Sequence, residues 1–479
     1  GGGGGRRRSR DRASGSNYQR HTQSRRNNFG RRSRRREENG TRSRSRSRDC
    51  HRARARRRRR RSISSSPYTE SASYSNSNSR SHSHSDSESS SNQSYDDSEG
   101  RIRIKSGEFI GSKGRYEVLG VAGEGTFGTV LNVVDTKYDE PLAVKVVRSV
   151  TRYLEAAKVE EDILRRIRRE DPDKESLCVR FKNKFDITFR GKKHVCLGFE
   201  RLGKSLYGFL KSNHYRGFRM AQVRVFGYQL LKAVKFCHSI RLIHTDLKPE
   251  NILLEDSDYK YEKQGTHSDY RVPLSERIRL IDFGGATFED DHHSRIINTR
   301  QYRSPEVMFG LGWSYPSDLW SVGCILAELY TGDLLFKTHE DMEHLALMEK
   351  IVGPLPQHMC LAAEKLHRRD ENSSSSHRGG EHKRSKRRGR STSRPRVSDW
   401  VEKGRIRWPE NASGKSSLTK VRRARHIKAQ FRNKEYVDLL LKLLQHDPKE
   451  RISAKEAMRH PFFKNIVDRN GNVHLDERT

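Results

Sequence analysis

Apolar residues are nearly absent from the first 100 positions of this 479-residue chain and recur at regular spacings after Arg115. Runs that begin at Tyr116 and continue at residues 130–134 and 142–147 are short, rich in Val and separated by turn residues. Such runs are typical of neighbouring strands. The pattern predicts an antiparallel meander of three strands at the start of one folded body of about 350 residues.

A second pattern, with apolar residues three and four positions apart, predicts helices. The first helix is expected over residues 153–167, with Ala156, Val159, Ile163 and Leu164 near one face. Further helices are predicted over residues 221–239, 318–331, 344–352 and 435–445. Strands followed by helices predict an α+β architecture with two lobes.

Two segments have a composition that does not support a packed core. Residues 1–100 combine an Arg-Ser alternation at 42–48, an arginine run at 56–61 and a serine-rich acidic stretch. Residues 367–396 form a basic, serine-rich insert within the helical half. Neither segment holds enough apolar surface to offset the entropy of ordering it, so we predict a disordered tail and a disordered insert.

The formal net charge of +37 is concentrated in these two segments. The first 100 residues carry 26 arginines against ten acidic residues, and the insert carries 11 basic against three acidic residues. This balance indicates polyanionic partners, either nucleic acid or phosphorylated protein.

The remaining bulk features indicate a soluble intracellular protein. Six cysteines are scattered without a CxxC pair, which predicts reduced thiols. No apolar run approaches the roughly 20 residues that span a bilayer, and the N-terminus lacks a secretion signal pattern. The chain begins with Gly instead of Met, as a fragment of a longer protein would.

The candidate chemistry begins with a glycine-rich loop between two predicted strands, Gly123-Glu124-Gly125-Thr126-Phe127-Gly128-Thr129-Val130. Glycines let backbone amides close over phosphates, although a plain hairpin explains such a loop when it stands alone. Lys145 lies 17 residues after Gly128 on the third strand, where its ammonium can pair with ATP phosphates or simply face solvent. Glu160 is the candidate partner that orients Lys145; Glu155 and Glu161 lie close by, and Glu161 is the runner-up.

The most specific signal is the run His244-Thr245-Asp246-Leu247-Lys248-Pro249-Glu250-Asn251. In this run Asp246 would accept the proton of the substrate hydroxyl, Lys248 would neutralise charge on the transferred phosphoryl group, and Asn251 would hold one of two Mg²⁺ ions. Asp282, in Asp282-Phe283-Gly284, follows Asn251 by 31 residues and would supply the main Mg²⁺ carboxylate. A lone Asp-Phe-Gly is more often a turn after a strand, but the spacing makes that interpretation minor here.

Supporting residues follow in sequence. Glu306, in Ser304-Pro305-Glu306, is expected to pair with Arg451, and Asp318 to bond the backbone of the 244–251 loop. All these motifs occur in the one order that a protein kinase requires. The sequence therefore predicts an active, bilobal protein kinase that uses ATP and Mg²⁺.

The predicted domain boundaries follow from the motifs. The kinase domain is expected over residues 116–463, with the N-lobe at 116–202 and the C-lobe, which contains the basic insert, at 203–463. A C-terminal tail is expected over residues 464–479.

The nucleotide is expected to lie at the linker between the lobes. Backbone groups of Glu200 and Leu202 would meet the adenine edge, and Phe199, which can equally end an apolar strand, would limit the pocket behind it. The other residues expected around the nucleotide are Gly123, Glu124, Gly125, Thr126, Phe127, Gly128, Val130, Ala143, Lys145, Glu250, Asn251, Leu253 and Asp282.

With these motifs in place, the sequence resembles the LAMMER, or CDC-like, dual-specificity protein kinases. The motif that names the family is Glu343-His344-Leu345-Ala346-Leu347-Met348-Glu349-Lys350-Ile351-Val352-Gly353-Pro354-Leu355-Pro356, with Leu347 for the usual Met and Lys350 for the usual Arg. Another match is Asn298-Thr299-Arg300-Gln301-Tyr302-Arg303-Ser304-Pro305-Glu306-Val307. The resemblance covers about residues 115–463, and members of this family also commonly carry an Arg-Ser tail.

The resemblance implies a kinase of the nucleus, and of nuclear speckles within it, that phosphorylates Ser, Thr and occasionally Tyr. Its implied substrates are Arg/Ser-rich splicing factors and itself, which would regulate pre-mRNA splicing. The resemblance also implies an extra hairpin before Asp282, for which residues 258–277 are long enough. The chain departs from the family at Ser304, Gln301 and Gly208 and in the length of its insert.

Thr245 stands where many kinases carry an Arg that captures a phosphate on the activation segment. Threonine cannot form those paired bonds. Our hypothesis is that activation does not need a phosphorylated segment anchored at this position. Thr287, Ser294, Thr299 and Tyr302 are candidate autophosphorylation sites.

The Arg-Ser tail allows several functions. Docking and nuclear targeting are favoured over direct RNA binding, because the tail has few aromatic residues for base stacking. Weak RNA contact through phosphates and a solvated spacer are the alternatives. We expect no membrane partner, and the oligomeric state is open.

Two other kinds of protein compete with an active kinase. The first is an Arg-Ser scaffold with a catalytically weak kinase fold. The presence of Lys145, Asp246 and Asp282 argues against this alternative. The second is an RNA-associated binding protein, for which no RNA-recognition pattern occurs. An Arg-Ser-directed kinase also needs acidic residues near its substrate groove, and residues 289–291 are candidates by position alone.

Overall fold

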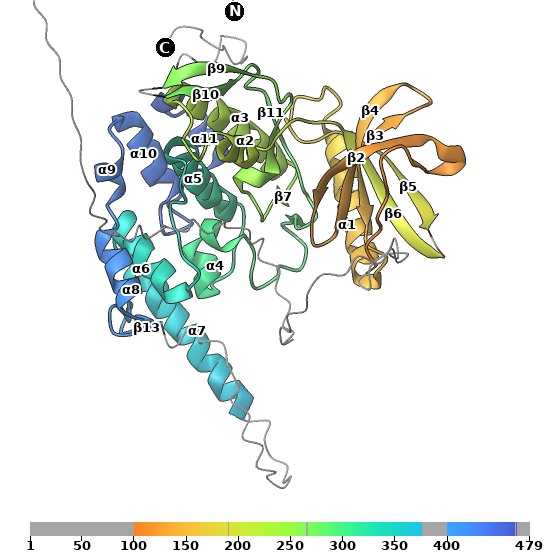
Figure 1. Cartoon of the computed structure of the whole chain (residues 1–479). Coiled ribbons are helices and arrows are strands. Elements are labelled where there is room, and N and C mark those ends of the chain that lie inside the picture. Colours follow the sequence, from red (N-terminus) through yellow and green to blue (C-terminus); the bar gives the residue numbers. More distant parts are fainter. Residues whose placement is uncertain (1–99, 190, 265–266, 376–399, 465, 467–479) are drawn as a thin grey trace, which may run out of the picture. The chain divides into compact units, whose positions relative to one another are not determined.

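The structure is a computed structural model that describes residues 100–189, 191–264, 267–375, 400–464 and 466 (Figure 1). All of these residues fall within one unit of the chain, residues 75–479. The predicted disordered tail, apart from Gly100, and nearly all of the predicted C-terminal tail lie outside the described residues.

The first lobe is built on an antiparallel sheet, which in the described residues has the strand order β1-β2-β3-β4-β6-β5. Its strands are β1 (Phe109–Ile110), β2 (Tyr116–Glu124), β3 (Gly128–Asp135), β4 (Glu140–Val147), β5 (Phe181–Phe189) and β6 (Lys192–Glu200). Strands β2, β3 and β4 pair in sequence, so the predicted meander is confirmed. Along β4, Leu142, Val144 and Val146 are buried while Lys145 is half-buried, because successive side chains point to opposite faces of a sheet. Lys145 therefore projects from the face opposite the apolar core of this sheet.

Helix α1 (Thr151–Glu170) packs against strands β4, β5 and β6 of this sheet (Figure 1). The predicted inward face is partly wrong, because Val159 is 58% exposed while Glu160 is buried. The core face runs from Ile163 and Leu164 back through Glu160 to Ala157. An apolar pattern cannot reveal this face, since its central member is a carboxylate.

The second lobe is mostly helical. Its helices are α2 (Leu206–Ser212), α3 (Met220–Ser239), α4 (Pro305–Phe309), α5 (Pro316–Thr331), α6 (Asp341–Ile351), α7 (Gln357–Ser375), α8 (Lys415–Arg423), α9 (Ile427–Gln430), α10 (Lys434–Leu443) and α11 (Ala454–Ala457). Every residue of α5 from Ser317 to Leu329 is buried, so this helix forms the centre of the lobe. The helices predicted near 221–239, 318–331, 344–352 and 435–445 are confirmed within a few residues at each end.

Short two-stranded sheets carry the loops of the second lobe. Their strands are β7 (Leu242–Ile243) with β12 (Thr287–Phe288), β8 (Ile252–Leu254) with β11 (Ile278–Leu280), β9 (Tyr259–Gln264) with β10 (His267–Pro273), and β13 (Val401–Glu402) with β14 (Arg405–Ile406). The β9–β10 pair is the extra hairpin expected within residues 258–277. The β8–β11 pair brings Asn251, which directly precedes β8, close to Asp282, which follows β11 after Ile281.

The predicted start of the basic insert at residue 367 is wrong. Helix α7 continues to Ser375, so residues 367–375 belong to a helix. Residues 363–371 are rich in Ala, Glu, Lys, Leu and Arg, which are good helix formers, and the polar composition conceals this propensity. The rest of the insert, from residue 376, lies outside the described residues up to residue 399.

Two further features of the described residues concern their thiols and their helices. The five cysteines in the described residues are all buried free thiols. None of the described helices combines the length and the apolar character needed to cross a bilayer.

A buried ion pair joins distant parts of the second lobe. Arg451 Nη1 lies 2.7 Å from Glu306 Oε1, and Nη2 lies 2.9 Å from Oε2, with both side chains at most 2% exposed. The guanidinium also donates to the carbonyls of Pro316, Gln445 and His446. The expected pairing of these two residues is confirmed, and it fixes the start of α4 against the C-terminal part of the lobe.

We predict that Arg451→Met lowers the free energy of unfolding by about 3–5 kcal/mol, because the Glu306 carboxylate would stay buried without its partner. Chemical denaturation followed by circular dichroism measures the change. Lys337→Met is the control, since Lys337 and its partner Asp333 are both 64% exposed and such pairs contribute less than about 1 kcal/mol. Equal effects of the two substitutions would contradict the structural role of Arg451.

Candidate active site

The glycine-rich loop is the turn between β2 and β3. Gly125 N donates to Gly128 O at 2.9 Å, which closes the turn. A Cβ atom at Gly128 would lie 2.2 Å from Val146 O, so only glycine fits there. A Cβ atom at Gly123 or Gly125 would meet nothing within 4 Å, so open space lies over these two residues. That space is where a phosphate group could approach the backbone.

Lys145 lies at the centre of a buried charge cluster. Its Nζ atom is 2.7 Å from Glu160 Oε1 and 2.8 Å from Glu160 Oε2, and 3.5 Å from Asp282 Oδ1. Burial disfavours the ammonium ion, but the negative charges of Glu160 and Asp282 outweigh it and raise the pKa of Lys145. Glu161 instead binds Arg165 on the surface of α1, so the structure pairs Lys145 with Glu160 and not with the runner-up.

Three apolar residues face the gap between the lobes. Val130, Ala143 and Leu253 are each half-buried, while both sequence neighbours of each are buried. The strand alternation therefore turns these three side chains away from the two cores. Phe199 and Glu200 end β6, and Phe199 packs edge-on against Phe181 at 5.9 Å. These residues form apolar walls of the kind that an adenine ring needs.

Asp246 is held by three hydrogen bonds. Its Oδ2 atom accepts from Lys248 Nζ at 2.6 Å, and its Oδ1 atom accepts from the backbone N and the Oγ1 of Thr299 at 3.0 and 2.8 Å. Burial alone would raise the pKa of Asp246, but the charge of Lys248 and these hydrogen bonds outweigh it and hold the pKa below its usual value. Asp246 is therefore ionised and able to accept a proton at neutral pH.

Asp318, at the start of α5, fixes the loop that carries Asp246. Asp318 accepts from the backbone N of His244 and of Thr245, at 2.9 and 3.0 Å, and from His238 Nε2 at 2.9 Å. The expected support from Asp318 is confirmed. Asn298 adds a second link, because its Nδ2 atom donates to Thr245 O at 2.8 Å.

Three residues of the site adopt backbone angles that are rare outside glycine. The φ angles of Thr245, Asp282 and Asn298 are 66°, 64° and 63°. Strained residues of this kind cluster at functional sites and persist only when their surroundings hold them in place. Here Thr245 Oγ1 donates to Gly285 O at 2.7 Å, which ties the catalytic loop to the segment that follows Asp282.

Asp282 and Asn251 could together hold a divalent cation. The Asp282 side chain is 38% exposed despite its contact with Lys145, so it can offer an oxygen to a ligand. Asn251 Nδ2 donates to Asp246 O at 2.9 Å, which leaves the Oδ1 atom as the acceptor. The described residues contain no cluster of three His, Cys, Asp or Glu side chains for a metal. A cation here would therefore complete its shell with nucleotide oxygens, as Mg²⁺ usually does in kinase sites.

Glu328 on α5 is a buried carboxyl group that the sequence did not single out. It is 4% exposed, and its Oε2 atom accepts from the Tyr302 hydroxyl at 2.6 Å. Burial, together with the nearby charge of Glu250, raises the pKa of Glu328 to about 8. Tyr302 is itself 4% exposed, so its prediction as an autophosphorylation site is wrong for the folded chain.

The acidic run at 289–291, expected near the substrate groove, is largely engaged elsewhere. The Glu289 carboxylate accepts from Ser314 Oγ at 2.8 Å, and Asp290 pairs with Arg241 at 2.6 Å. Position in the sequence is therefore a poor guide to the acidic residues of this site.

The comparisons with known proteins agree with this geometry. The model of the protein kinase domain matches residues 116–463. The serine/threonine-protein kinase AFC1 of Arabidopsis thaliana is 44% identical over 77% of this chain and 74% of its own length. The dual specificity protein kinase CLK2 of Homo sapiens is 38% identical over 77% of this chain and 68% of its own length. A crystal structure of a kinase domain is 37% identical, with a TM-score of 0.66 over 77% of this chain and all of that chain.

The chain belongs to the LAMMER branch of the protein kinases. The kinase therefore transfers a phosphoryl group from ATP to protein and depends on a divalent cation. The fold class expected from the sequence is confirmed in the described residues, while the roles of single site residues and the exact domain boundaries stay predictions.

The positions of these side chains are compatible with their predicted roles. Bound ATP and its cation would supply the phosphoryl group and neutralise part of its charge. Lys145, which is held by Glu160, would bind phosphate oxygens. Asp246 would accept the proton of the substrate hydroxyl, and Lys248, 2.6 Å from it, would neutralise negative charge near the transferred group.

We predict that Glu160→Gln lowers kcat/KM for peptide phosphorylation by at least about 100-fold, because a displaced Lys145 would no longer hold the phosphates in line. Glu161→Gln is the matched control on the same helix and should leave kcat/KM nearly unchanged. Steady-state kinetics on a short peptide, with unfolding curves for both variants, measures the effect. A loss of activity in Glu161→Gln equal to that in Glu160→Gln would contradict the assignment.

Proposed function

We propose that the kinase phosphorylates Ser and Thr, and occasionally Tyr, in Arg/Ser-rich splicing factors and in its own Arg-Ser tail, and so regulates pre-mRNA splicing. We further propose that it acts in the nucleus, in nuclear speckles, with Mg²⁺ as its cation. Support for Mg²⁺ comes from the all-oxygen donors that Asp282 and Asn251 offer. The tail composition supports the nuclear location, since Arg-Ser-rich segments suit docking and targeting.

The observation that carries the substrate proposal is a pair of carboxyl groups beside the catalytic loop, Glu250 and Glu328. Neither has a Lys, Arg or His within 4 Å among the described residues, although basic residues far outnumber acidic ones in the chain. Glu250 Oε2 is buried and lacks a hydrogen-bond partner in the described part of the chain. Burial raises the pKa of Glu250 as well. A buried carboxyl oxygen without a partner is costly, and a substrate guanidinium would satisfy that of Glu250.

Glu250 directly precedes Asn251 in the catalytic loop, and Glu328 lies beneath the segment that carries Tyr302. An arginine next to the target serine could therefore reach these carboxyl groups while the serine faces Asp246. Binding of the guanidinium would favour the ionised form of Glu328, which is mostly protonated below pH 8 when it is unpaired. Substrate recognition would then release a proton at neutral pH.

We expect the kinase to phosphorylate an Arg-Ser repeat peptide with ATP and Mg²⁺, and Asp282→Ala to abolish the activity. Glu250→Gln should raise KM for this peptide by about tenfold, because one charged contact to arginine is lost. The same substitution should change KM much less for a matched peptide that has Gln in place of Arg. Phosphate incorporation, measured with both peptides, tests the proposal.

Glu289→Gln is the control, because the Glu289 carboxylate is bonded to Ser314 and lies outside the proposed subsite. Equal signals from wild type and Asp282→Ala would refute the catalytic assignment. Equal rates on the Arg and Gln peptides would refute the preference for Arg-Ser substrates while leaving the kinase activity in place.

A further inference from the structure

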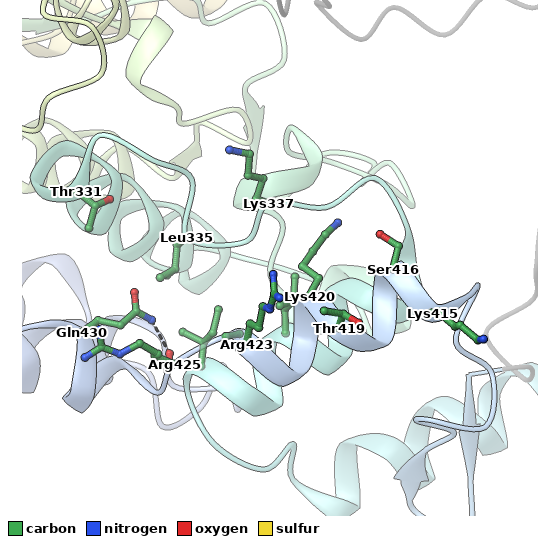
Figure 2. Close-up of a pocket in the computed structure, with 13 residues that line it drawn as sticks. Thr331, Leu335, Lys337, Lys415, Ser416, Thr419, Lys420, Arg423, Arg425 and Gln430 are labelled. Atoms are coloured by element: carbon green, nitrogen blue, oxygen red, sulfur yellow. Dashed lines mark hydrogen bonds between the residues drawn. The ribbon is translucent and has the colours of Figure 1, made fainter. Parts of the chain in front are cut away.

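A second site lies away from the catalytic loop, between the end of α5, helix α6 and helix α8. It is a pocket of about 860 Å³ (Figure 2). Asp318, which holds the catalytic loop, is near the first residue of α5, and Thr331, which lines the pocket, is the last. At 1.5 Å per residue the two ends of this helix are roughly 20 Å apart, so the pocket is not part of the active site.

The charged residues that line this pocket are all positive. Five of its thirteen residues are basic and none is acidic; the basic ones are Lys337, Lys415, Lys420, Arg423 and Arg425. Figure 2 shows that they come from more than one element. Lys337 lies on the segment after α5, and Lys415, Lys420 and Arg423 lie on α8. A concave site lined by one sign of charge attracts ligands of the opposite sign.

Not all of these charges are neutralised within the protein. Lys420 Nζ lies 2.6 Å from Glu343 Oε1, and Lys337 pairs with Asp333 at 3.0 Å. Lys415 and Arg423 have no carboxylate within 4 Å among the described residues. Both residues lie on α8 and line the pocket. The pocket therefore keeps an excess of positive charge that a ligand can satisfy.

The floor of the pocket is apolar. Leu347 and Ile351, four residues apart on α6, are 3% and 4% exposed, and Leu335 lies beside them. Both α6 residues belong to the Glu343–Pro356 motif that names the family, and Glu343 holds Lys420 in place. This motif therefore builds the floor and one edge of the pocket, which is a physical role distinct from catalysis.

We propose that this pocket binds phosphoserine in Arg-Ser segments that the kinase has already phosphorylated. The inference rests on the proposed function, because it takes the product of that reaction as the ligand. Each phosphate adds about two negative charges, so a fully phosphorylated Arg-Ser repeat is anionic while the unmodified repeat is cationic. Guanidinium and ammonium groups bind phosphate well, and the same groups repel an unmodified repeat. The pocket would thus separate product from substrate and keep a partly phosphorylated chain near the active site.

The lining favours a peptide over RNA as the ligand. None of the thirteen residues is aromatic, so the pocket offers no platform on which bases could stack. The apolar floor also suits a side chain and a short stretch of backbone better than a continuous phosphate chain. RNA is therefore the competing outcome of the experiment.

The test uses the full chain after phosphatase treatment. Fluorescence anisotropy measures the binding of a short Arg-Ser peptide phosphorylated on every serine, of the unmodified peptide and of an oligouridine of matched length. The charge-reversed variant Lys415→Glu/Arg423→Glu should bind the phosphopeptide at least about tenfold more weakly than wild type. Arg422→Glu is the matched control, because Arg422 is exposed on the same helix and does not line the pocket. Its affinity should stay close to that of wild type.

The outcomes separate this proposal from the proposed function. Equal weakening by Arg422→Glu, or loss of oligouridine binding in parallel with the phosphopeptide, would overturn the phosphoserine site. Phosphorylation of a peptide with one Arg-Ser unit should be the same in all three proteins. If wild type does not phosphorylate that peptide, the proposed function fails, and the binding result still decides whether the pocket takes phosphoserine. Weaker phosphopeptide binding after autophosphorylation would identify the kinase's own tail as a source of the ligand.

Discussion

The active site depends on one buried pair of opposite charges, Lys145 on β4 and Glu160 on α1. Neither charge can be buried alone without a large cost in free energy. The pair therefore forms only when α1 lies against the sheet, through Ile163 and Leu164, with its carboxylate facing β4. Asp282 joins the pair at 3.5 Å from Lys145, which couples the position of α1 to the segment of the second lobe that carries the predicted metal ligand.

The central helix α5 organises the second lobe in a similar way. At its start, Asp318 accepts hydrogen bonds from the catalytic loop and fixes the conformation around Thr245. Further along, the buried carboxyl group of Glu328 accepts a hydrogen bond from Tyr302. At its end, Thr331 borders the basic pocket. One helix thus links the support of the catalytic loop, the proposed substrate contact and the proposed product site.

Most of the fold and the centre of the site could be predicted from the sequence. The order of the motifs is local information, and it indicated Lys145, Asp246 and Asp282 because kinase chemistry requires these residue types at these spacings. The features that were missed depend on tertiary packing. The inward face of α1 passes through Glu160, and a charged residue does not register in an apolar pattern.

Other missed features have the same origin. Glu328 and Tyr302 lie 26 residues apart and meet only in the folded chain. The basic pocket combines α6 with α8, and the segment between these helices includes the basic insert, which masks the charge of α8 in any composition count. Helix α7 extends into the insert because its residues favour a helix despite their polarity. Sequence reasoning is therefore strongest where function restricts single residues and weakest where distant residues share one surface.

Our hypothesis from Thr245 is that the active site does not need a phosphate anchored on the activation segment. The Lys145–Glu160 pair and the bond from Thr245 to Gly285 O would hold the site together instead. The most direct test is rapid mixing of phosphatase-treated kinase with ATP, Mg²⁺ and an Arg-Ser peptide, with phosphopeptide measured from the first turnover. We expect product to form without a lag and at the same rate as with autophosphorylated kinase. A lag that disappears after preincubation with ATP would contradict it.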